Sequence, residues 1–303
     1  MKNLIIGNRG FLGSHLYKRL KEKGEDVKGI DNLMHPCKQK VPSKYGDIRY
    51  YHDIENGIEW ADTVYLLAAQ IHVDKSISNP EETLDINVKG TMNVLEAVKK
   101  FDKRLVFASS SEVYGTSNSW YMDEHHQLDG QSPYAASKTA GDRLCKAYYD
   151  TFGTRATILR NFNTFGEFQN DGSYGGVIAI FTRRAIDGQD LCIYGDGKQE
   201  RDYMHVSDAI SGYELCMESP NLVGRAVNVG SGNTVTINEL AEVIIKLTGS
   251  KSKVIHIDPR PGEVHRLCAD TTLAKENGFV STTDMEKDLK TYVEWYKSNN
   301  RSR

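Results

Sequence analysis

The stretch Gly7-Asn8-Arg9-Gly10-Phe11-Leu12-Gly13 decides the fold, because it joins an apolar segment to an amphipathic one through three glycines. The segment before it, Leu4-Ile5-Ile6, has the character of a short buried strand. The segment from Phe11 to Lys23 carries leucines at positions 12, 16 and 20, which is helical spacing. Glycines between a strand and a helix let the backbone approach a diphosphate at the positive end of the helix. The stretch therefore predicts a dinucleotide-binding βα unit.

An acidic side chain stands where a dinucleotide site needs one. Val27–Asp31 is predicted as the second strand, and Asp31 is its last residue. A carboxylate at that place accepts hydrogen bonds from the adenosine ribose and repels a 2′-phosphate, so it favours NAD over NADP. The competing interpretation is a tight turn without a ligand, with Asp31 as a helix cap. The order of strand, glycines and helix favours the cofactor site.

Strands and helices alternate through the first half of the chain, which predicts an α/β fold with a doubly wound parallel sheet. Further strands are predicted at Ile48–Ile54, Asp62–Ala69, Arg104–Ser109 and Arg155–Leu159, and helices at Asn87–Lys100 and Tyr134–Thr151. After Gly166 the rhythm changes, and Glu167–Gly176 is rich in Gly, Asn and Asp. We expect a Rossmann domain over residues 1–166 and a smaller α/β substrate lobe over 167–303, with residues 226–230 rejoining the main sheet.

The composition argues against a nucleic-acid-binding, membrane-spanning or secreted protein. The 303 residues carry 38 Lys and Arg against 41 Asp and Glu, a net charge of −3, which argues against binding nucleic acid. No apolar run reaches the ~18 residues of a membrane span. The N-terminal apolar run is interrupted at Gly7, so we expect no secretory signal. The five cysteines are an odd number without CxxC spacing, which is typical of reduced thiols in a cytoplasmic protein.

Three polar residues predict a proton-transfer site, with Ser110 after a strand, and Tyr134 and Lys138 four positions apart on one helix face. A tyrosine beside a lysine and a cationic nicotinamide has a lowered pKa. A shift from about 10 to about 7 needs roughly 4 kcal/mol. Tyr134 would then take a proton from an alcohol while hydride passes to NAD⁺. Without other motifs, Tyr134 and Lys138 would be interpreted as two surface side chains of a long helix. The glycine stretch, which predicts a bound NAD, favours the interpretation as a catalytic pair.

With these motifs the chain resembles an extended short-chain dehydrogenase/reductase of the NAD-dependent nucleotide-sugar epimerase/dehydratase family. The segments that carry the resemblance, besides the glycine stretch, are Asp53-Ile54, Leu67-Ala68-Ala69, Asn87–Thr91, Ser109–Gly115, Tyr134–Lys138, Arg160–Gly166, Gly195–Val206 and Arg260–Arg266. They span nearly the whole chain and are specific for the family, but much less specific for the reaction. The resemblance implies an enzyme that oxidises C4 of a nucleotide-bound sugar to a ketone with bound NAD.

The resemblance also implies a role for each matching position. The residues expected to bind NAD are Gly7, Gly10, Phe11, Leu12, Gly13, Asp31, Asn32, Asp53, Ile54, Leu67, Ala68, Ala69, Tyr134 and Lys138. Ser110 would hold the reacting sugar oxygen, and Tyr134 would be the base. The residues expected to bind substrate are Ser111, Asn163, Arg201, Arg260 and Arg266, with Asn163 and Arg201 at the diphosphate.

The residues after Ser110 bear on the step that follows C4 oxidation. Glu112 is suited to remove the acidified C5 proton, which leads to loss of water across C5 and C6, as in a 4,6-dehydratase. Ser111 stands where many dehydratases have an acid, and Gly195–Gln199 is typical of epimerase-like members, so a UDP-hexose 4-epimerase is the alternative. A UDP-uronate decarboxylase ranks third, and an NAD-binding sensor or scaffold is the non-enzymatic alternative. The simpler interpretation of Glu112 is a carboxylate that faces outward or pairs with a nearby cation.

The remaining expectations concern partners. We expect a nucleotide-sugar substrate, with UDP as the commonest carrier in the family, and no nucleic acid, membrane or metal partner. His125-His126 lies on a polar loop without a Cys or Glu at ligand spacing. The resemblance implies a homodimer through helices 87–100 and 134–151. The apolar stripe expected at that interface is Ala140, Leu144, Ala147 and Tyr148, unless the core of the chain itself covers it.

Overall fold

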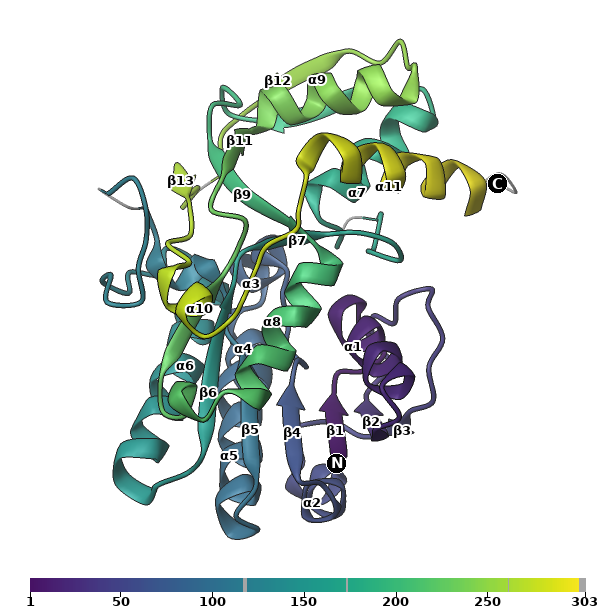
Figure 1. The fold of residues 1–303 in the computed structure, drawn as a ribbon. Coiled ribbons are helices and arrows are strands. Elements are labelled where there is room, and N and C mark those ends of the chain that lie inside the picture. The colour runs from purple at the N-terminus through teal and green to yellow at the C-terminus, as the bar shows by residue number, and fades with distance from the viewer. Residues whose placement is uncertain (117–118, 173, 261, 300–303) are drawn as a thin grey trace.

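The computed structural model describes residues 1–116, 119–172, 174–260 and 262–299. A parallel sheet runs through it in the order β10-β6-β5-β4-β1-β2-β3 (Figure 1). Its strands are β1 (Lys2–Ile6), β2 (Asp26–Asp31), β3 (Lys44–Tyr45), β4 (Thr63–Leu66), β5 (Arg104–Ala108), β6 (Ala156–Asn161) and β10 (Ala226–Val229). The doubly wound parallel α/β fold predicted from the sequence is confirmed.

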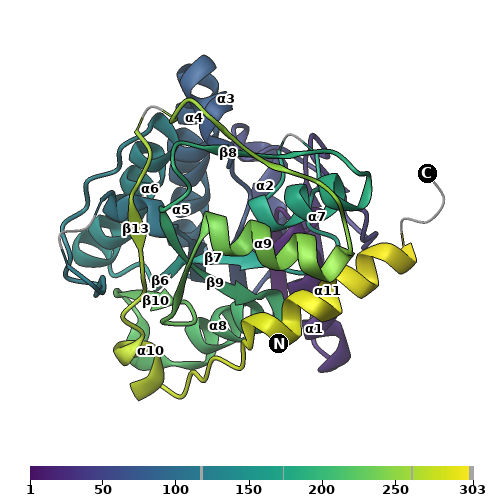
Figure 2. The ribbon, with the colours of Figure 1, turned by 90° about the horizontal axis from the view of Figure 1, so that it is seen from above.

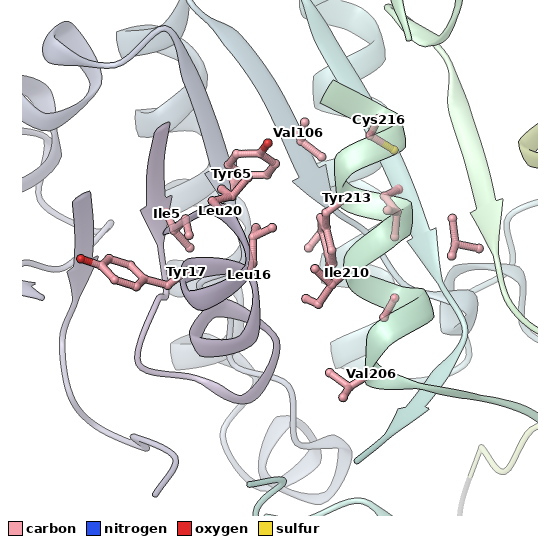
Figure 3. Packing of buried hydrophobic residues seen from close by; sticks show 14 of the residues in the cluster. Ile5, Leu16, Tyr17, Leu20, Tyr65, Val106, Val206, Ile210, Tyr213 and Cys216 are labelled. Carbon is pink, nitrogen blue, oxygen red and sulfur yellow. The ribbon is translucent and has the colours of Figure 1, made fainter. Parts of the chain in front are cut away.

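Helices cover both faces of this sheet, because neighbouring strand residues point to opposite faces. The helices are α1 (Phe11–Glu22), α2 (Tyr51–Trp60), α5 (Gly90–Lys100), α6 (Pro133–Phe152) and α8 (Val206–Glu218). Ile5 and Tyr65 pack on one face with α1 and with Tyr213 of α8 (Figure 3). Their neighbours Leu4 and Leu66 pack on the other face with α2, α5 and α6. Burial on both faces explains why the strands are apolar at successive positions.

The second half of the chain builds smaller sheets above the carboxyl ends of the main strands (Figures 1 and 2). Strand β9 lies between β11 and β13 and also pairs with β7, while β8 pairs with β12. The strands are β7 (Asn163–Phe165), β8 (Leu191–Tyr194), β9 (Glu200–His205), β11 (Thr234–Thr236), β12 (Val254–Ile257) and β13 (Arg266–Leu267). Helices α7 (Val177–Ile186), α9 (Ile237–Thr248) and α11 (Met285–Asn299) share a separate hydrophobic core with them.

Short helices complete the described chain. They are α3 (Val73–Ser78), α4 (Pro80–Leu84), α10 (Thr272–Glu276), a π-helical turn at Asp85–Lys89 and 3₁₀ turns at Ser111–Tyr114 and Pro220–Leu222. The predicted return of Ala226–Val229 to the main sheet is confirmed, since β10 pairs in parallel with β6. No helix in the described ranges is both long and apolar enough to span a bilayer.

Helix α6 begins and ends where its sequence dictates. The hydroxyl of Ser132 accepts a hydrogen bond from Ala135 N (3.1 Å), and Pro133 occupies the first turn. Gly153, with a φ of 69°, terminates the helix in the left-handed conformation. This start places Tyr134 in the first turn of the helix, at the carboxyl edge of the sheet.

The predicted third strand at Ile48–Ile54 is wrong. The sheet takes only the short strand β3 from this region, and the chain enters α2 at Tyr51. Ile54 and Ile58 are four positions apart and both fully buried, so they belong to one helix face. A short apolar run does not distinguish strand spacing from helix spacing.

The apolar stripe predicted on α6 is partly used within the chain. Leu144 and Tyr148 pack against the core that α6 shares with α5, and the hydroxyl of Tyr148 donates to Glu96. Ala147 is exposed and Ala140 is half-buried. Leu144 and Tyr148 are therefore partly covered by the chain itself, and an interface through this stripe stays a prediction.

Candidate active site

A cleft of about 580 Å³ opens at the carboxyl ends of the parallel strands. Its walls come from the loops after β1, β2, β4 and β5 and from the segment between β7 and α7. Those loops carry the glycine stretch, Asp31, Leu67–Ala69 and Ser109–Glu112, which are motifs that the sequence singled out. Sheets of this kind bind ligands at the same edge. The structure thus brings motifs from distant parts of the chain into one cavity.

The glycines are required by close backbone contacts. Gly7 has a φ of +93°, and a Cβ there would lie 2.5 Å from Ala68 N. A Cβ at Gly13 would lie 2.1 Å from Gly7 O. Gly10 precedes α1 without a side-chain cap, so the free N–H groups of the first turn face the cleft without a competing side chain. The loop is therefore shaped for a diphosphate.

Asp31 stands at the end of β2 and lines the cleft. One carboxylate oxygen accepts a hydrogen bond from Arg9 N (2.9 Å), and the other accepts one from Leu33 N (2.7 Å). Each oxygen keeps a further lone pair, so the fixed carboxylate can still accept from a ribose diol. Asn32 also lines the cleft and donates to Asp47 Oδ2 (3.0 Å). These groups fit the adenosine half of NAD.

On the adenosine side the structure places Asp47 and Ile48, not Asp53 and Ile54. Asp47 and Ile48 line the cleft, whereas Ile54 is fully buried in the core. Asp53 lies in the first turn of α2, where its carboxylate accepts from Asp47 N (2.9 Å). The sequence contains three Asp-Ile pairs, at residues 47–48, 53–54 and 85–86, and the motif was matched to the second, whereas both residues of the first line the cleft. Gly46, directly before the first pair and at the cleft, is the signal that distinguishes them.

Leu67, Ala68 and Ala69 line the cleft as predicted. The loop that follows them is fixed by Asn87, whose side-chain amide accepts from Gln70 N and donates to Gln70 O, both at 2.8 Å. The same amide donates to Ser137 of α6 (2.8 Å). Asn87 lies in the π-helical turn before α5, a conformation often found at functional sites. It therefore positions the loop relative to the helix that carries Tyr134.

Ser110, Tyr134 and Lys138 line the cleft together. The Ser110 hydroxyl accepts from Glu112 N (3.2 Å) and forms a hydrogen bond with the Tyr134 phenol. Lys138, one turn further along α6, donates to the backbone oxygen of Ala108 at the end of β5. The serine, tyrosine and lysine that the sequence predicted as one site thus come from two elements that meet at the sheet edge.

The pKa of Tyr134 differs from the prediction. Burial raises the pKa of Tyr134 to about 12, and the hydrogen bond with Ser110 offsets only part of this rise. Lys138 is not among the groups that shift the pKa of Tyr134, and its ammonium group donates a hydrogen bond to Ala108 O. Burial also lowers the pKa of Lys138 to about 8. The prediction that Lys138 lowers the pKa of Tyr134 is therefore wrong. The further lowering expected from a cationic nicotinamide stays a prediction.

Glu112 faces the cleft and is half-buried there, so an outward-facing carboxylate is excluded. Burial raises the pKa of Glu112, and the positive charge of Arg201 opposes the rise. Glu263 adds to the rise, whereas Arg260 opposes it. The charge of Glu112 in turn raises the pKa of Tyr134, which places both groups in the same part of the cleft. A carboxyl group with a raised pKa is suited to proton transfer near neutral pH.

The predicted substrate residues fall into two groups. Ser111, Asn163 and Arg260 line the cleft. The side-chain nitrogen of Asn163 is buried and has no hydrogen-bond partner within the described ranges, so it is a donor available to an anion. Arg260 forms an ion pair with Asp74 at 3.0 Å, at the rim of the same cleft.

Arg201 and Arg266 do not reach the lining of the cleft. Arg201 lies directly behind Glu112 and forms an ion pair with Glu263 at 3.1 Å. Arg266 forms an ion pair with Glu200 at 2.8 Å, and its guanidinium lies 3.2 Å from the ring centroid of Trp120. These contacts engage Arg266 outside the cleft lining, and its role at the substrate stays a prediction.

Sequence reasoning missed His35 and Tyr174 of the cleft, whereas His72, expected to be structural or to line a pocket, lies beside them. His35, His72 and Tyr174 line the cleft, and they come from three different loops. These residues lie in loops, where side chains follow neither helix nor strand spacing, so the hydrophobic pattern of the sequence does not indicate which of them face a cavity. The only signal was the Gly-rich composition of the segment around Tyr174, which predicts a loop and not the direction of a side chain.

Replacing Gly13 with Ala is expected to weaken NAD binding by about tenfold or more, because forcing a methyl group into this contact costs about 1–3 kcal/mol. The measurement is a titration of the purified protein with NAD. Gly24→Ala is the control, because it strains a positive φ of +79° but its Cβ meets open space. Equal NAD affinity in the Gly13 and Gly24 variants would contradict a diphosphate at this loop.

The comparison with known proteins agrees with this geometry. A family model described as "NAD dependent epimerase/dehydratase family" matches residues 3–230. A Methanocaldococcus jannaschii protein with the provisional name UDP-glucose 4-epimerase is 36% identical over 99% of each chain. The UDP-N-acetyl-alpha-D-glucosaminuronate decarboxylase of Bacillus cytotoxicus is 34% identical over 97% of each chain. The dTDP-glucose 4,6-dehydratase DesIV of Streptomyces venezuelae, solved with NAD bound, has a TM-score of 0.92 and 28% identity over 99% of this chain and 98% of its own.

Proposed function

The chain belongs to the NAD-dependent epimerase/dehydratase family, and from this premise we propose that it is a nucleotide-sugar 4,6-dehydratase. Enzymes of this family use NAD to act on nucleotide sugars, so NAD is the cofactor. The glycine loop, Asp31 and the buried amide of Asn163 fit a dinucleotide beside a sugar diphosphate. The observation that carries the choice of reaction is the place of Glu112, in the same part of the cleft as Tyr134.

The first step is oxidation at C4 of the sugar. When bound, NAD accepts the hydride from C4 and returns it at C6, so the cofactor ends each cycle unchanged. The chain supplies the proton chemistry. Ser110 holds the C4 hydroxyl oxygen and Tyr134 takes its proton. Lys138, once its ammonium group leaves Ala108 O, brings a positive charge that favours the phenolate form of Tyr134. C4 is then a ketone.

The second step is loss of water across C5 and C6. The C4 ketone makes the C5 proton acidic, and Glu112 takes it. The raised pKa of Glu112 makes its carboxylate a stronger base than an exposed glutamate. The protonated carboxyl group then gives its proton to the C6 hydroxyl as the C6–O bond breaks, so one water leaves. In the last step C5 takes up a proton from water through Glu112, Tyr134 releases to water the proton that it took from the C4 hydroxyl, and the product is a 4-keto-6-deoxy sugar.

We propose UDP as the nucleotide carrier. Two of the relatives described above are named for UDP-sugars, and one for a dTDP-sugar. In this chain the groups available to the diphosphate are Asn163 and Arg260 at the cleft and Arg201 behind it. Arginine forks bind phosphate oxygens in pairs, so either arginine that leaves its carboxylate partner can serve the diphosphate.

A UDP-hexose 4-epimerase is the second candidate, favoured by Ser111. Within the described residues, the carboxylates that line the cleft are Asp31, Asp47, Asp74 and Glu112. Asp74 is paired with Arg260, so Glu112 has no second acid beside it. Epimerisation needs only Ser110 and Tyr134 as proton-transfer groups, and the Methanocaldococcus jannaschii relative is named for it. Decarboxylation of a UDP-uronate ranks third, on the Bacillus cytotoxicus relative.

The deciding experiment is mass spectrometry of the products formed from a panel of UDP-, dTDP-, GDP- and CDP-sugars, including a UDP-uronate. A product lighter by one water supports the dehydratase. A product of unchanged mass with a new retention time overturns it in favour of the epimerase, and a product lighter by carbon dioxide overturns it in favour of the decarboxylase. The nucleotide of the preferred substrate tests the choice of UDP in the same experiment.

The pH dependence of kcat/KM is expected to be bell-shaped. Glu112 must be ionised to act as a base, so activity falls as the pH drops through its raised pKa. Lys138 must be charged, so activity falls as the pH rises through about 8, the value to which burial lowers its pKa. A pH–rate profile of the wild type checks both limbs. An activity that stays constant well above pH 8 would contradict the role of Lys138.

We also propose that two copies associate through α5 and α6. Met92 of α5 is 43% exposed, and Ala147 of α6 is exposed on the neighbouring helix, so apolar surface remains there after the core of the chain is packed. Sedimentation of the wild type and of Met92→Lys tests this. A monomeric wild type would contradict it.

A further inference from the structure

Three side chains from three loops meet across the mouth of the cleft. Tyr174 contacts His35, from the loop after β2, and His72, from the loop after β4. The ring centroids are 4.8 Å apart for the pair with His35 and 4.7 Å apart for the pair with His72. All three residues also line the cleft. Since the loops after β2 and β4 form the cofactor side of the cleft, these contacts tie that side to the segment before α7.

An ion pair connects the same two segments a second time. Lys38 Nζ lies 3.5 Å from Asp171 Oδ2. Tyr296 of α11 donates a hydrogen bond to the Asp171 carboxylate, and Arg183 of α7 donates to the Asp171 carbonyl (2.7 Å). Asp171 is therefore fixed to two helices of the upper part of the molecule. Figure 1 shows the purple loop after β2 rising towards the teal segment between β7 and α7.

We propose that His35, Lys38, His72, Asp171 and Tyr174 form a clasp that keeps NAD in the cleft throughout the reaction cycle. This proposal rests on the proposed function, because only a reaction that regenerates NAD in each cycle lets the enzyme keep the cofactor bound. Loss of the cofactor after C4 oxidation would release a 4-keto sugar and stop catalysis. A contact that joins the two walls above the cofactor side slows that loss.

The clasp is built so that it can open without unfolding the protein. Tyr174 is 39% exposed and the side chain of Lys38 is 50% exposed, so neither belongs to a hydrophobic core. Aromatic pairs and exposed ion pairs each contribute modestly to stability. By contrast, Asp171 is only 8% exposed and has partners on α7 and α11. Opening therefore means that the loop after β2 moves away from a fixed partner.

The test measures release of NAD from the holoenzyme in the absence of sugar. Bound NAD is assayed at intervals after rapid desalting. Tyr174→Ala is expected to release NAD about tenfold faster than the wild type, because both aromatic contacts are lost. Tyr174→Phe keeps the ring and is expected to release NAD at the wild-type rate. Tyr121→Ala is the matched control, since Tyr121 is 49% exposed and lies outside the cleft lining.

Lys38→Met tests the ion pair, and Lys40→Met, on the same loop and exposed, is its control. We expect faster release from Lys38→Met only. Lys38 is half exposed, so this variant keeps the test decisive even if Tyr174→Ala fails to fold. Wild-type release rates in both Tyr174→Ala and Lys38→Met would overturn the clasp, and so would equal acceleration in the two controls. Because no sugar is present, this result is independent of the product panel that decides the reaction.

Discussion

Replacing Tyr134 with Phe is expected to lower the turnover of the nucleotide sugar by about 10²–10⁴-fold, the usual contribution of a positioned proton-transfer group. The variant loses only the hydroxyl, which forms a hydrogen bond with Ser110 in the cleft. The ring stays, and Tyr134 is 8% exposed, so the packing of α6 against the sheet is kept. The measurement is kcat/KM with the substrate that the product panel identifies, together with the NAD content of the purified variant.

Tyr65→Phe is the matched control for this experiment. Tyr65 is fully buried, and its hydroxyl has no hydrogen-bond partner among the described residues, so its removal changes no polar contact. Turnover within about tenfold of the wild type in Tyr134→Phe would show that another group takes the C4 proton. If the wild type bound NAD but turned over none of the nucleotide sugars in the panel, the protein would fit a cofactor-binding sensor better than an enzyme.

Replacing Glu112 with Gln is expected to slow the loss of water by about 10²–10⁴-fold while C4 oxidation continues. Gln has the size of Glu but cannot take the C5 proton. The two steps then separate, and reduced nicotinamide accumulates on the enzyme in a single turnover. The absorbance of reduced nicotinamide and the mass of the released sugar nucleotide measure the two steps in one sample. The acid limb of the pH profile disappears in the same variant.

Glu124→Gln controls for the loss of a buried carboxyl group. Burial raises the pKa of Glu124 as it does that of Glu112, but Glu124 lies outside the main cleft, where it accepts from Asn228 N (2.7 Å). Gln keeps an oxygen for that hydrogen bond. If Glu112→Gln still forms a dehydrated product at the wild-type rate, Glu112 is not the base, and its role reduces to balancing the charge of Arg201.

The elements of the main sheet can be predicted from the sequence because their signals are local. Leu4-Ile5-Ile6 is apolar at successive positions, and both faces of β1 are buried by helices. Helix α6 carries its own start at Pro133 and its own end at Gly153. The region of Ile48–Ile54 could not be assigned in this way, since a short apolar segment does not reveal whether a sheet or a helix will bury it.

The residues of the site can be predicted from the sequence where they belong to one continuous motif, as those of the glycine loop do. The pKa shifts and ion pairs of the site could not be predicted, because they depend on distances between residues that are far apart in the chain. The pKa of Tyr134 follows from its burial, from the hydrogen bond with Ser110 and from the charge of Glu112. The place of Arg266 follows from contacts with Glu200 and Trp120, which are far from it in the chain. The Asp-Ile pair was misplaced because the sequence contains three such pairs, and only their three-dimensional surroundings separate them.

The pairing of β10 with β6 has a consequence for synthesis on the ribosome. A nascent chain that ends at residue 166 exposes the edge of β6, a strand whose apolar residues are buried in the finished protein. It also lacks α8, which covers one face of the sheet. The strand and helix that complete this half are translated only after β7, α7, β8 and β9. We therefore expect the main sheet of the cofactor-binding half to be completed only after the segments from β7 to β9 have been translated.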